Sequence, residues 1–237
     1  MIESASTFPA AFARLRGDAR LAVYIDLKSP YAFIAIRPTR DMARSVGVEI
    51  DWRPFTLDIP SYMGSAKLVK NSKKVESANR TPQQWTGVRY AYRDARRYAQ
   101  LTGKTLRGTE KIWDSSRAGI AMLWAKGQGA LDRFIDMAYP PFWKRALDIE
   151  DWEVLERTLT DAGVGVAGFR EWADGPGRAQ HDCTNEEAFD AGVYGVPTYL
   201  VDDEMWFGRE HLPRIAWLLG GRRGPAPDVA NRSFASQ

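Results

Sequence analysis

Two groups of strand-forming residues, one near each end of the chain, are the strongest constraint on its fold. Residues 21–26 (LAVYID) are apolar and rich in β-branched and aromatic side chains, and a turn-like KSP segment follows them. The pattern predicts a helix from Pro30 to about Val46 that ends at Gly47, and then a second strand at Val48–Trp52. Because a strand, a helix and a strand in succession usually form a parallel pair, the chain is expected to open with an α/β unit.

The back of the chain has the pattern of a hairpin followed by a helix. Residues 198–202 (TYLVD) and 204–207 (EMWF) alternate around an acidic turn, and a last helix is expected near residues 209–219. A β-α-β unit at the front and a β-β-α unit at the back give the thioredoxin topology. The sequence therefore predicts an α/β thioredoxin fold made of residues 20–59 and 193–220.

The residues between these units, 60–192, show no convincing strand pattern. Apolar side chains recur at helical spacing from Trp85 to Ala99 and from Leu131 to Trp143. This block is expected to be an all-helical insertion domain. The remaining residues, 221–237, are rich in Gly, Pro and Arg and are expected to form a flexible tail.

Local signals suggest where helices begin and end within this block. Asp148–Asp151 is expected to open a helix, and Thr184 with Glu187 is expected to form a capping box. Pro140–Pro141 is expected to kink or break a helix.

The composition argues against several classes of function. The net charge is only +3 and the basic residues are mostly scattered, so nucleic acid is not an expected partner. Apolar stretches are too short to cross a membrane and no leader pattern is present, so the protein is expected to be cytoplasmic. The single cysteine, Cys183, leaves no CxxC pair and is expected to be buried, and only two histidines are present, so no metal site is expected.

Ser29 lies where the first strand gives way to the first helix. Serine followed by proline is an ordinary start of a helix, because the hydroxyl accepts from a free amide and Pro30 has no amide to leave unpaired. The same position, at the positive end of a helix, also suits an anion such as the thiolate of a bound molecule. Both interpretations stay open from the residues alone.

A second candidate feature is the segment Gly192–Thr198, which leads into the first strand of the hairpin. A proline entering a strand is often only an edge or turn residue. If the Val196–Pro197 bond is cis, however, the Val196 backbone faces outward and is able to pair with a peptide-like ligand.

Several segments, in this order and spacing, resemble the 2-hydroxychromene-2-carboxylate isomerases and kappa-class glutathione transferases, a branch of the DsbA-like thioredoxin superfamily. They are VYIDLKSPYAFIA, DWRPF, RYAYRDARRYAQLTG, FWKRALDIED and EEAFDAGVYGVPTYLVDDEMWFGREHL. The resemblance implies glutathione as cofactor, a small aromatic substrate and a homodimer. It also implies that Ser29 faces the glutathione sulfur, that Val196 pairs with the cysteinyl backbone of glutathione, that Pro197 is cis, and that Asn79 lies near glutathione.

The chain departs from this family at two places. A lysine of the family falls on Gly87, where Arg89 is the candidate replacement, and the family's Ser-Asp pair that holds the glutamyl end reads Arg209–Glu210. Aromatic candidates for the substrate pocket are Tyr31, Phe55 and Trp85, whereas Phe33 and Trp52 are expected to be plain core residues. Asp94 and Arg97 match the family but are interpreted as a surface ion pair.

The sequence thus leaves two functions in competition. The first is a glutathione-dependent isomerase or transferase that acts on an aromatic or chromene-like carboxylate, with Ser29 stabilising the thiolate. The second is a redox-inactive DsbA-like binding protein that lacks glutathione chemistry, and Gly87 and Arg209 favour it. A dithiol oxidoreductase is excluded because the chain has one cysteine.

Overall fold

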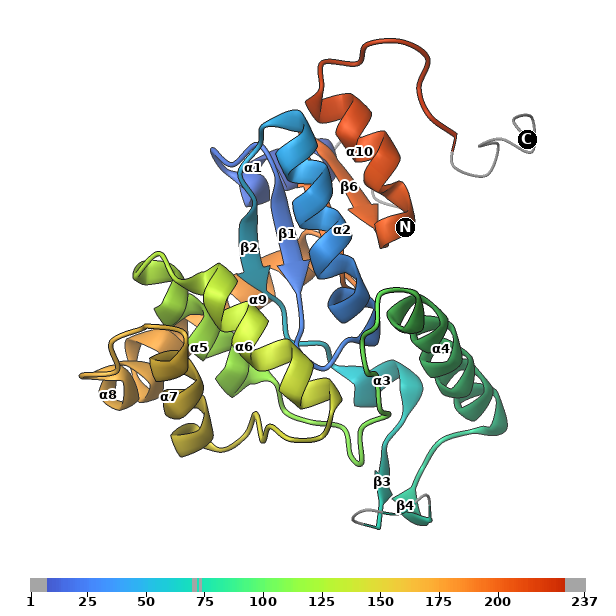
Figure 1. The fold of residues 1–237 in the computed structure, drawn as a ribbon, viewed down its shortest axis with the longest axis vertical. Helices are drawn as coiled ribbons and strands as arrows, with labels where there is room; N and C mark the ends of the chain where they lie inside the picture. The colour runs from blue at the N-terminus through green and yellow to red at the C-terminus, as the bar shows by residue number, and fades with distance from the viewer. Residues whose placement is uncertain (1–7, 70–71, 73, 229–237) are drawn as a thin grey trace.

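The computed structural model describes residues 8–69, 72 and 74–228. Its central sheet has the strand order β2-β1-β5-β6 (Figure 1), with β1 at Ala22–Ile25, β2 at Asp51–Pro54, β5 at Thr198–Val201 and β6 at Glu204–Phe207. β1 pairs with β2 in parallel and with β5 antiparallel, and β5 pairs with β6 antiparallel. The predicted thioredoxin fold is confirmed, although β2 begins three residues later than the sequence pattern suggested.

Helices pack around this sheet, which lies in the upper half of Figure 1. α2 (Pro30–Val46) and α10 (Leu212–Leu219) lie side by side in Figure 1, and α1 (Phe8–Arg16) contacts β5 and β6. α2 begins and ends as predicted, since the Ser29 side chain caps its first turn and Gly47 ends it with a φ of 64° that favours glycine. The last predicted helix is divided into a short 3-10 turn, η1 (Arg209–His211), and α10.

The prediction of an all-helical insertion is wrong at one place. β3 (Ala66–Leu68) and β4 (Val75–Ala78) form a separate antiparallel pair. All of β4 is exposed, and β3 has only three residues, none of them fully buried, so the pair is too short and too exposed to give the longer apolar alternation that sequence reasoning depends on. The hairpin joins α3 (Ile59–Met63) to α4 (Pro82–Leu101), and we call residues 59–101 the arm, which lies at the lower right of Figure 1.

Five further helices form the rest of the insertion: α5 (Ser116–Gly127), α6 (Leu131–Trp143), α7 (Trp152–Asp161), α8 (Phe169–Asp174) and α9 (Pro176–Asp190). α7 begins after the Asp151 cap, as predicted. The predicted capping box at Thr184 is wrong, because α9 runs through this position from Pro176. Pro140–Pro141 was expected to kink or break a helix; the structure shows no break there, since both prolines lie in the last turns of α6.

An aromatic stack joins the insertion to the thioredoxin unit. The Phe33 ring on α2 lies nearly parallel to those of Tyr139 and Trp143 on α6, with centroids 6.0 and 5.9 Å apart. Phe33 and Trp52 are buried, which confirms that both are core residues. Cys183 is exposed, so the prediction of a buried thiol is wrong.

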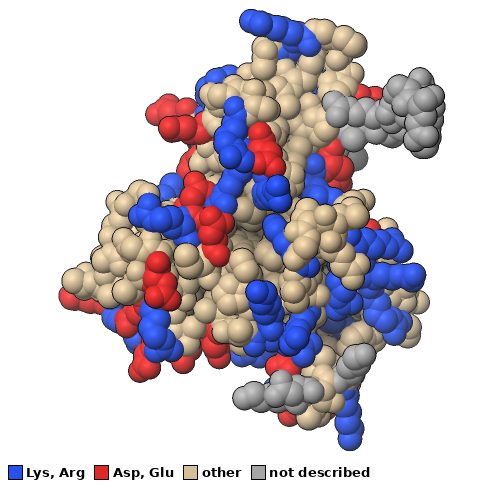
Figure 2. All heavy atoms as spheres, viewed as in Figure 1, with Lys and Arg blue, Asp and Glu red and all other residues tan. Residues whose placement is uncertain are grey.

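The remaining predictions about the surface are answered only in part. Residues 221–228 are almost all exposed, and Arg222 pairs with Asp202 at 3.1 Å; the rest of the predicted tail, 229–237, lies outside the described residues. Among the residues that the structure describes, no helix has the length and apolar character to cross a bilayer. In Figure 2, lysines and arginines are most frequent over the arm, around its helix α4.

Candidate functional site

The sequence places Ser29 between a buried strand and a helix, and the structure turns that junction towards the loop before β5. The Ser29 hydroxyl accepts a hydrogen bond from the Ala32 amide at 3.2 Å and donates one to the Val196 carbonyl at 3.2 Å. The Val196–Pro197 bond is cis. Two segments that are 167 positions apart in the sequence therefore meet at this junction.

The first turn of α2 retains one amide for a ligand. Pro30 has no amide, Ala32 donates to the Ser29 hydroxyl, and the Phe33 amide donates to the Ser29 carbonyl at 3.1 Å. The Tyr31 amide has no hydrogen-bond partner within the described part of the chain. An anion at this end of α2 would meet that amide, the positive end of the helix dipole and, after a rotation, the Ser29 hydroxyl.

This junction is nevertheless tightly closed. Ser29 is 4% exposed and Val196 is 3% exposed. The hydroxyl is already engaged on both sides, so it serves as a helix cap and a loop tie in the structure as it stands. A thiolate would have to compete with the Val196 carbonyl for the hydroxyl proton.

The loop before β5 is held by contacts that leave little space. The Thr198 hydroxyl donates to the Gly195 carbonyl at 2.7 Å, and the Gly208 amide donates to the Pro197 carbonyl at 3.0 Å. A Cβ atom at Gly195 would lie 2.6 Å from the Phe207 ring. The site thus depends on the absence of a side chain at position 195.

Gly195→Ala is therefore expected to destabilise the protein by about 1–3 kcal/mol, because the Phe207 ring must move to admit the methyl group. Gly127→Ala is the matched control, since a Cβ there meets nothing within 4 Å and α5 gains a better helix former. Urea denaturation of both variants measures the difference. Equal free energies of unfolding for Gly195→Ala and the wild type would contradict this description of the loop.

Tyr31 joins the start of α2 to the arm. Its hydroxyl donates to the Asp94 carboxylate at 3.3 Å, and Asp94 also lies 3.7 Å from an Arg97 nitrogen. Burial and the negative charge of Asp94 raise the pKa of Tyr31 to about 12, so the phenol stays neutral and keeps its proton near pH 7. Asp94 was interpreted as part of a surface pair alone, and the structure adds this link to the candidate site.

Arg209 and Glu210, the residues at the family's Ser-Asp position, lie in η1 and differ in their surroundings. The Arg209 guanidinium lies over the Tyr98 ring of α4, 3.9 Å from its centroid. Glu210 is exposed, and its carboxylate folds back over Gly208, where φ is 100° and a Cβ would lie 2.4 Å from a carboxylate oxygen. Glu210 is thus accessible to a cation, whereas Arg209 is already stacked against the arm.

The other predicted site residues make their contacts away from Ser29. Asn79 accepts from the Ser65 amide at the base of the hairpin, and the Trp85 ring carries the Arg80 guanidinium 5.1 Å from its centroid. Arg89 is exposed on α4. Phe55 is 4% exposed and packs edge-on against Tyr24, so it is a core residue in this structure and does not line an open pocket.

A buried ion pair next to Ser29 was not found from the sequence. The Lys28 ammonium lies 3.7 Å from the Asp26 carboxylate, and their side chains are 5% and 0% exposed. Asp26 also accepts from the Lys28 amide at 3.0 Å and the Leu57 amide at 2.9 Å. The sequence offered one signal for this ion pair, because Asp26 and Lys28 are charged residues at the two ends of the turn that follows an apolar strand.

The positive charge of Lys28 also acts on Asp114, which lies just before α5. Burial raises the pKa of Asp114, but hydrogen bonds from Ser116 and the positive charges of Lys28 and Arg178 outweigh it, so the pKa falls below its usual value. The Ser115 hydroxyl beside it is buried and has no hydrogen-bond partner among the described residues. The charge of Lys28, the residue before Ser29, thus acts on the turn at residues 113–116. The sequence assigned no role to this turn.

The chain is similar to known proteins in sequence and in fold. A 2-hydroxychromene-2-carboxylate isomerase of Sphingobium xenophagum is 26% identical over 190 residues, which are 80% of this chain and 92% of the relative. The solved structure of a 2-hydroxychromene-2-carboxylate isomerase superposes with a TM-score of 0.62 at 19% identity, covering 81% of this chain and 90% of the other. A probable DsbA oxidoreductase from Streptomyces coelicolor superposes with a TM-score of 0.66 at 18% identity, covering 88% and 93%.

The family assignment follows from the extent of one further match. A model of the DsbA-like thioredoxin domain matches residues 20–220, which is well over half of the chain and spans both the sheet and the insertion. The Val196–Pro197 bond is cis, as the resemblance implied. The chain belongs to the DsbA-like thioredoxin family.

Proposed function

We propose that this protein is a glutathione-dependent isomerase or transferase that acts on an aromatic or chromene-like carboxylate. The observation that carries the proposal is the Ser29 hydroxyl at the start of α2, 3.2 Å from the carbonyl of the cis Val196–Pro197 bond. Curated relatives named 2-hydroxychromene-2-carboxylate isomerase support the reaction class. A homodimer and a cytoplasmic location belong to the same proposal.

The residues present fit the two ends of glutathione unequally. At the sulfur end, the Tyr31 amide and the Ser29 hydroxyl are donors of the kind that stabilises a thiolate. At the glutamyl end, Glu210 offers a carboxylate to an ammonium group, but Arg209 is held against Tyr98. When bound, glutathione supplies a thiolate nucleophile for addition to a conjugated substrate.

The chain's own residues have correspondingly simple roles. Ser29 donates its proton to a negative charge once the hydroxyl turns from the Val196 carbonyl, and the Val196 backbone aligns a peptide-like ligand in strand fashion. Tyr31, neutral because of its raised pKa, presents a hydroxyl beside Asp94. Lys28 and Asp26 fix the turn that holds Ser29.

The proposal is tested by an assay of 2-hydroxychromene-2-carboxylate isomerisation with purified protein, followed by absorbance, with and without glutathione. We expect turnover that requires both protein and glutathione. S-methylglutathione, which keeps the peptide but lacks a free thiol, is the control and is expected to inhibit. Turnover that persists at the same rate without any thiol would exclude the proposed chemistry.

A second candidate is a redox-inactive binding protein that uses the same fold without glutathione. Two observations favour it: the hydroxyl of Ser29 is occupied on both sides, and Arg209 is stacked on Tyr98. Calorimetry separates the candidates, because a protein of this second kind would bind neither glutathione nor S-methylglutathione.

Arg209→Ser is expected to tighten glutathione binding by about 2- to 10-fold, because serine adds a neutral hydrogen-bond donor for the glutamyl end and removes a side chain committed to Tyr98. Arg214→Ser is the matched control, since Arg214 stacks on Trp217 in the same way, 4.6 Å from the ring centroid. Titration calorimetry measures both affinities. Tight binding by the wild type that Arg209→Ser leaves unchanged would show that this departure from the family does not matter.

A further inference from the structure

The arm exposes an unusual amount of apolar surface. Of the 20 residues of its helix α4, only Ala95 and Ala99 are buried. Nine large hydrophobic side chains are exposed in the described part of the chain, and six of them belong to the arm: Tyr62, Val69, Val75, Tyr90, Tyr98 and Leu101. Exposed apolar side chains that gather on one segment are typical of an interaction surface.

The arm is also strongly basic, and the opposite charge is concentrated in another part of the chain. Residues 59–101 contain nine lysines and arginines and two acidic residues, a net charge of +7. Residues 148–174, which include α7 and α8 and which we call the acidic end, contain eight acidic residues and two arginines, a net charge of −6. The arm lies at the lower right of Figure 1, and α7 and α8 lie at the lower left. One chain thus presents opposite charges on two sides.

Much of the positive charge of the arm has no carboxylate of its own. Arg89 and Arg93 are exposed and lie four positions apart, on the same side of α4. Lys74, just before β4, is exposed as well. None of these three side chains forms an ion pair or a hydrogen bond with a residue that the structure describes. They are therefore available to an acidic partner.

The acidic end has unpaired charges of the opposite sign. Asp161, Glu171 and Asp174 are exposed, and their carboxylates form no ion pair or hydrogen bond within the described residues. The two arginines of this segment are already engaged, since Arg157 lies 3.9 Å from Glu153 and Arg170 lies 3.8 Å from Glu156. Contact with a basic surface would relieve the repulsion among the remaining carboxylates.

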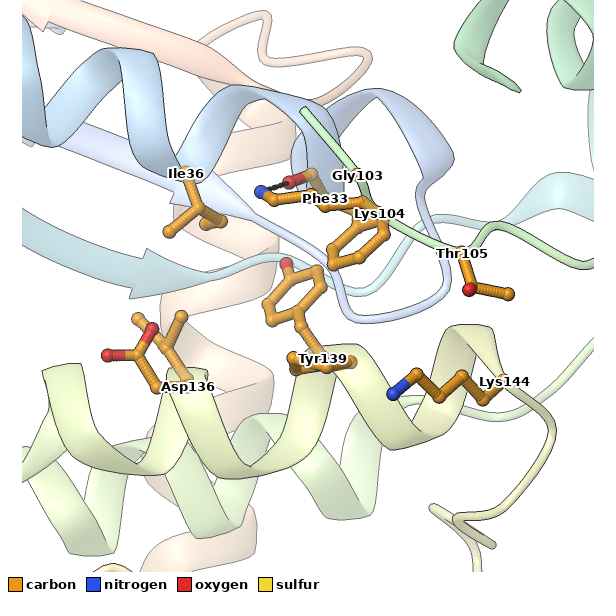
Figure 3. Close-up of a pocket in the computed structure, with 10 residues that line it drawn as sticks. Phe33, Ile36, Gly103, Lys104, Thr105, Asp136, Tyr139 and Lys144 are labelled. Atoms are coloured by element: carbon orange, nitrogen blue, oxygen red, sulfur yellow. Dashed lines mark hydrogen bonds between the residues drawn. The ribbon is translucent and has the colours of Figure 1, made fainter. Parts of the chain in front are cut away.

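The hollow between α2, α6 and residues 103–105 (Figure 3) adds charge to this surface and no apolar area. Its Phe33 and Tyr139 rings stack on each other and are 3% and 1% exposed. Lys104 and Lys144 lie at its rim, and Lys144 is exposed. The basic surface thus continues beyond the end of α4.

We propose that the arm binds the acidic end of a second copy of this chain, and that two such contacts related by a twofold axis close a dimer. A rotation of 180° about the vertical axis of Figure 1 exchanges left and right, so it places each arm opposite the acidic end of the other copy. The tyrosines and arginines of α4 are residue types that are enriched at protein interfaces, and the complementary charges fix the pairing. This inference assigns an interface to the homodimer of the proposed function, but it rests on charge and exposure and not on glutathione chemistry.

The test is sedimentation velocity of the full chain at low and high ionic strength. The wild type should form a dimer whose dissociation constant rises at least about tenfold between about 50 and 500 mM salt, because the contact is ionic. Arg89→Glu/Arg93→Glu on the arm and Glu171→Lys/Asp174→Lys on the acidic end should each weaken the dimer by about tenfold or more. Circular dichroism checks that each variant is folded.

A mixture of the two double variants makes the test specific. Their heterodimer has one contact between two reversed surfaces and one contact between two native surfaces, so mixing should restore the dimer at low salt. Asp18→Lys/Asp203→Lys, which reverses two exposed charges outside both surfaces, is the control and should dimerise as the wild type does.

Three results would overturn the proposal. They are a wild type that stays monomeric at low salt, a dimer that survives both charge reversals, and a mixture of the reversed variants that stays monomeric. Binding of a duplex oligonucleotide by a monomeric wild type would assign the arm to nucleic acid instead. The isomerase assay is independent of these measurements, so its failure would leave the interface standing.

Discussion

Asp26→Ala is expected to lower the free energy of unfolding by about 3–5 kcal/mol, because it leaves the nearly buried Lys28 ammonium without its counter-ion. The loss also removes the acceptor for the Lys28 and Leu57 amides, which fix the turn before Ser29 and the segment after β2. Urea denaturation followed by circular dichroism measures the effect. Asp203→Ala, a change at an exposed turn, is the control and should have little effect.

A double-mutant cycle makes this prediction specific. Lys28→Met alone should destabilise the protein, since it leaves a buried carboxylate, whereas Asp26→Ala/Lys28→Met should cost less than the sum of the two single changes. Additive effects of the two substitutions would mean that the charges do not interact. The 3.7 Å separation would then have no energetic consequence.

Ser29→Ala is expected to slow glutathione-dependent turnover by about 10- to 150-fold, the equivalent of a hydrogen bond to a charged sulfur worth about 1.5–3 kcal/mol. Stability should fall by only about 0.5–2 kcal/mol, because the change also deletes the helix cap on Ala32. Steady-state kinetics with saturating glutathione measures the first effect, and thermal unfolding measures the second.

Asp151→Ala is the matched control, since Asp151 caps α7 by accepting from Glu153 and Val154 and has no part in the proposed site. It should lose similar stability with no change in turnover. If Ser29→Ala behaves in the same way as Asp151→Ala, then Ser29 is a helix cap and nothing more.

The strands and helices of the thioredoxin unit could be predicted because their signals are local. Ser29–Pro30 and Gly47 mark the two ends of α2, and β6 lies where its alternation placed it. α1 was missed although Gly17 follows it with a φ of 63° and Arg14 and Arg16 lie in its last turn. Its contacts with β5 and β6 are ones that no local pattern shows. The hairpin in the arm was missed because its strands have no buried face.

The part of the candidate site that belongs to the thioredoxin unit could also be predicted, whereas its contacts with the insertion could not. Ser29 and Val196 each adjoin a strand of one sheet, so the topology alone brings them together. Contacts that depend on how the insertion packs, such as Tyr31 with Asp94 and Arg209 with Tyr98, could not be derived from spacing. Asp26 and Lys28 are charged residues at a strand end, and only tertiary burial distinguishes them from surface charges.

The most direct test of the account is a pH titration of glutathione bound to the protein, monitored by the ultraviolet absorbance of its thiolate. The account predicts that the wild type lowers the thiol pKa below that of free glutathione and that Ser29→Ala raises it by about one to two units relative to the wild type. The same titration curve in both proteins, accompanied by a lower melting temperature for Ser29→Ala, would contradict the role proposed for Ser29.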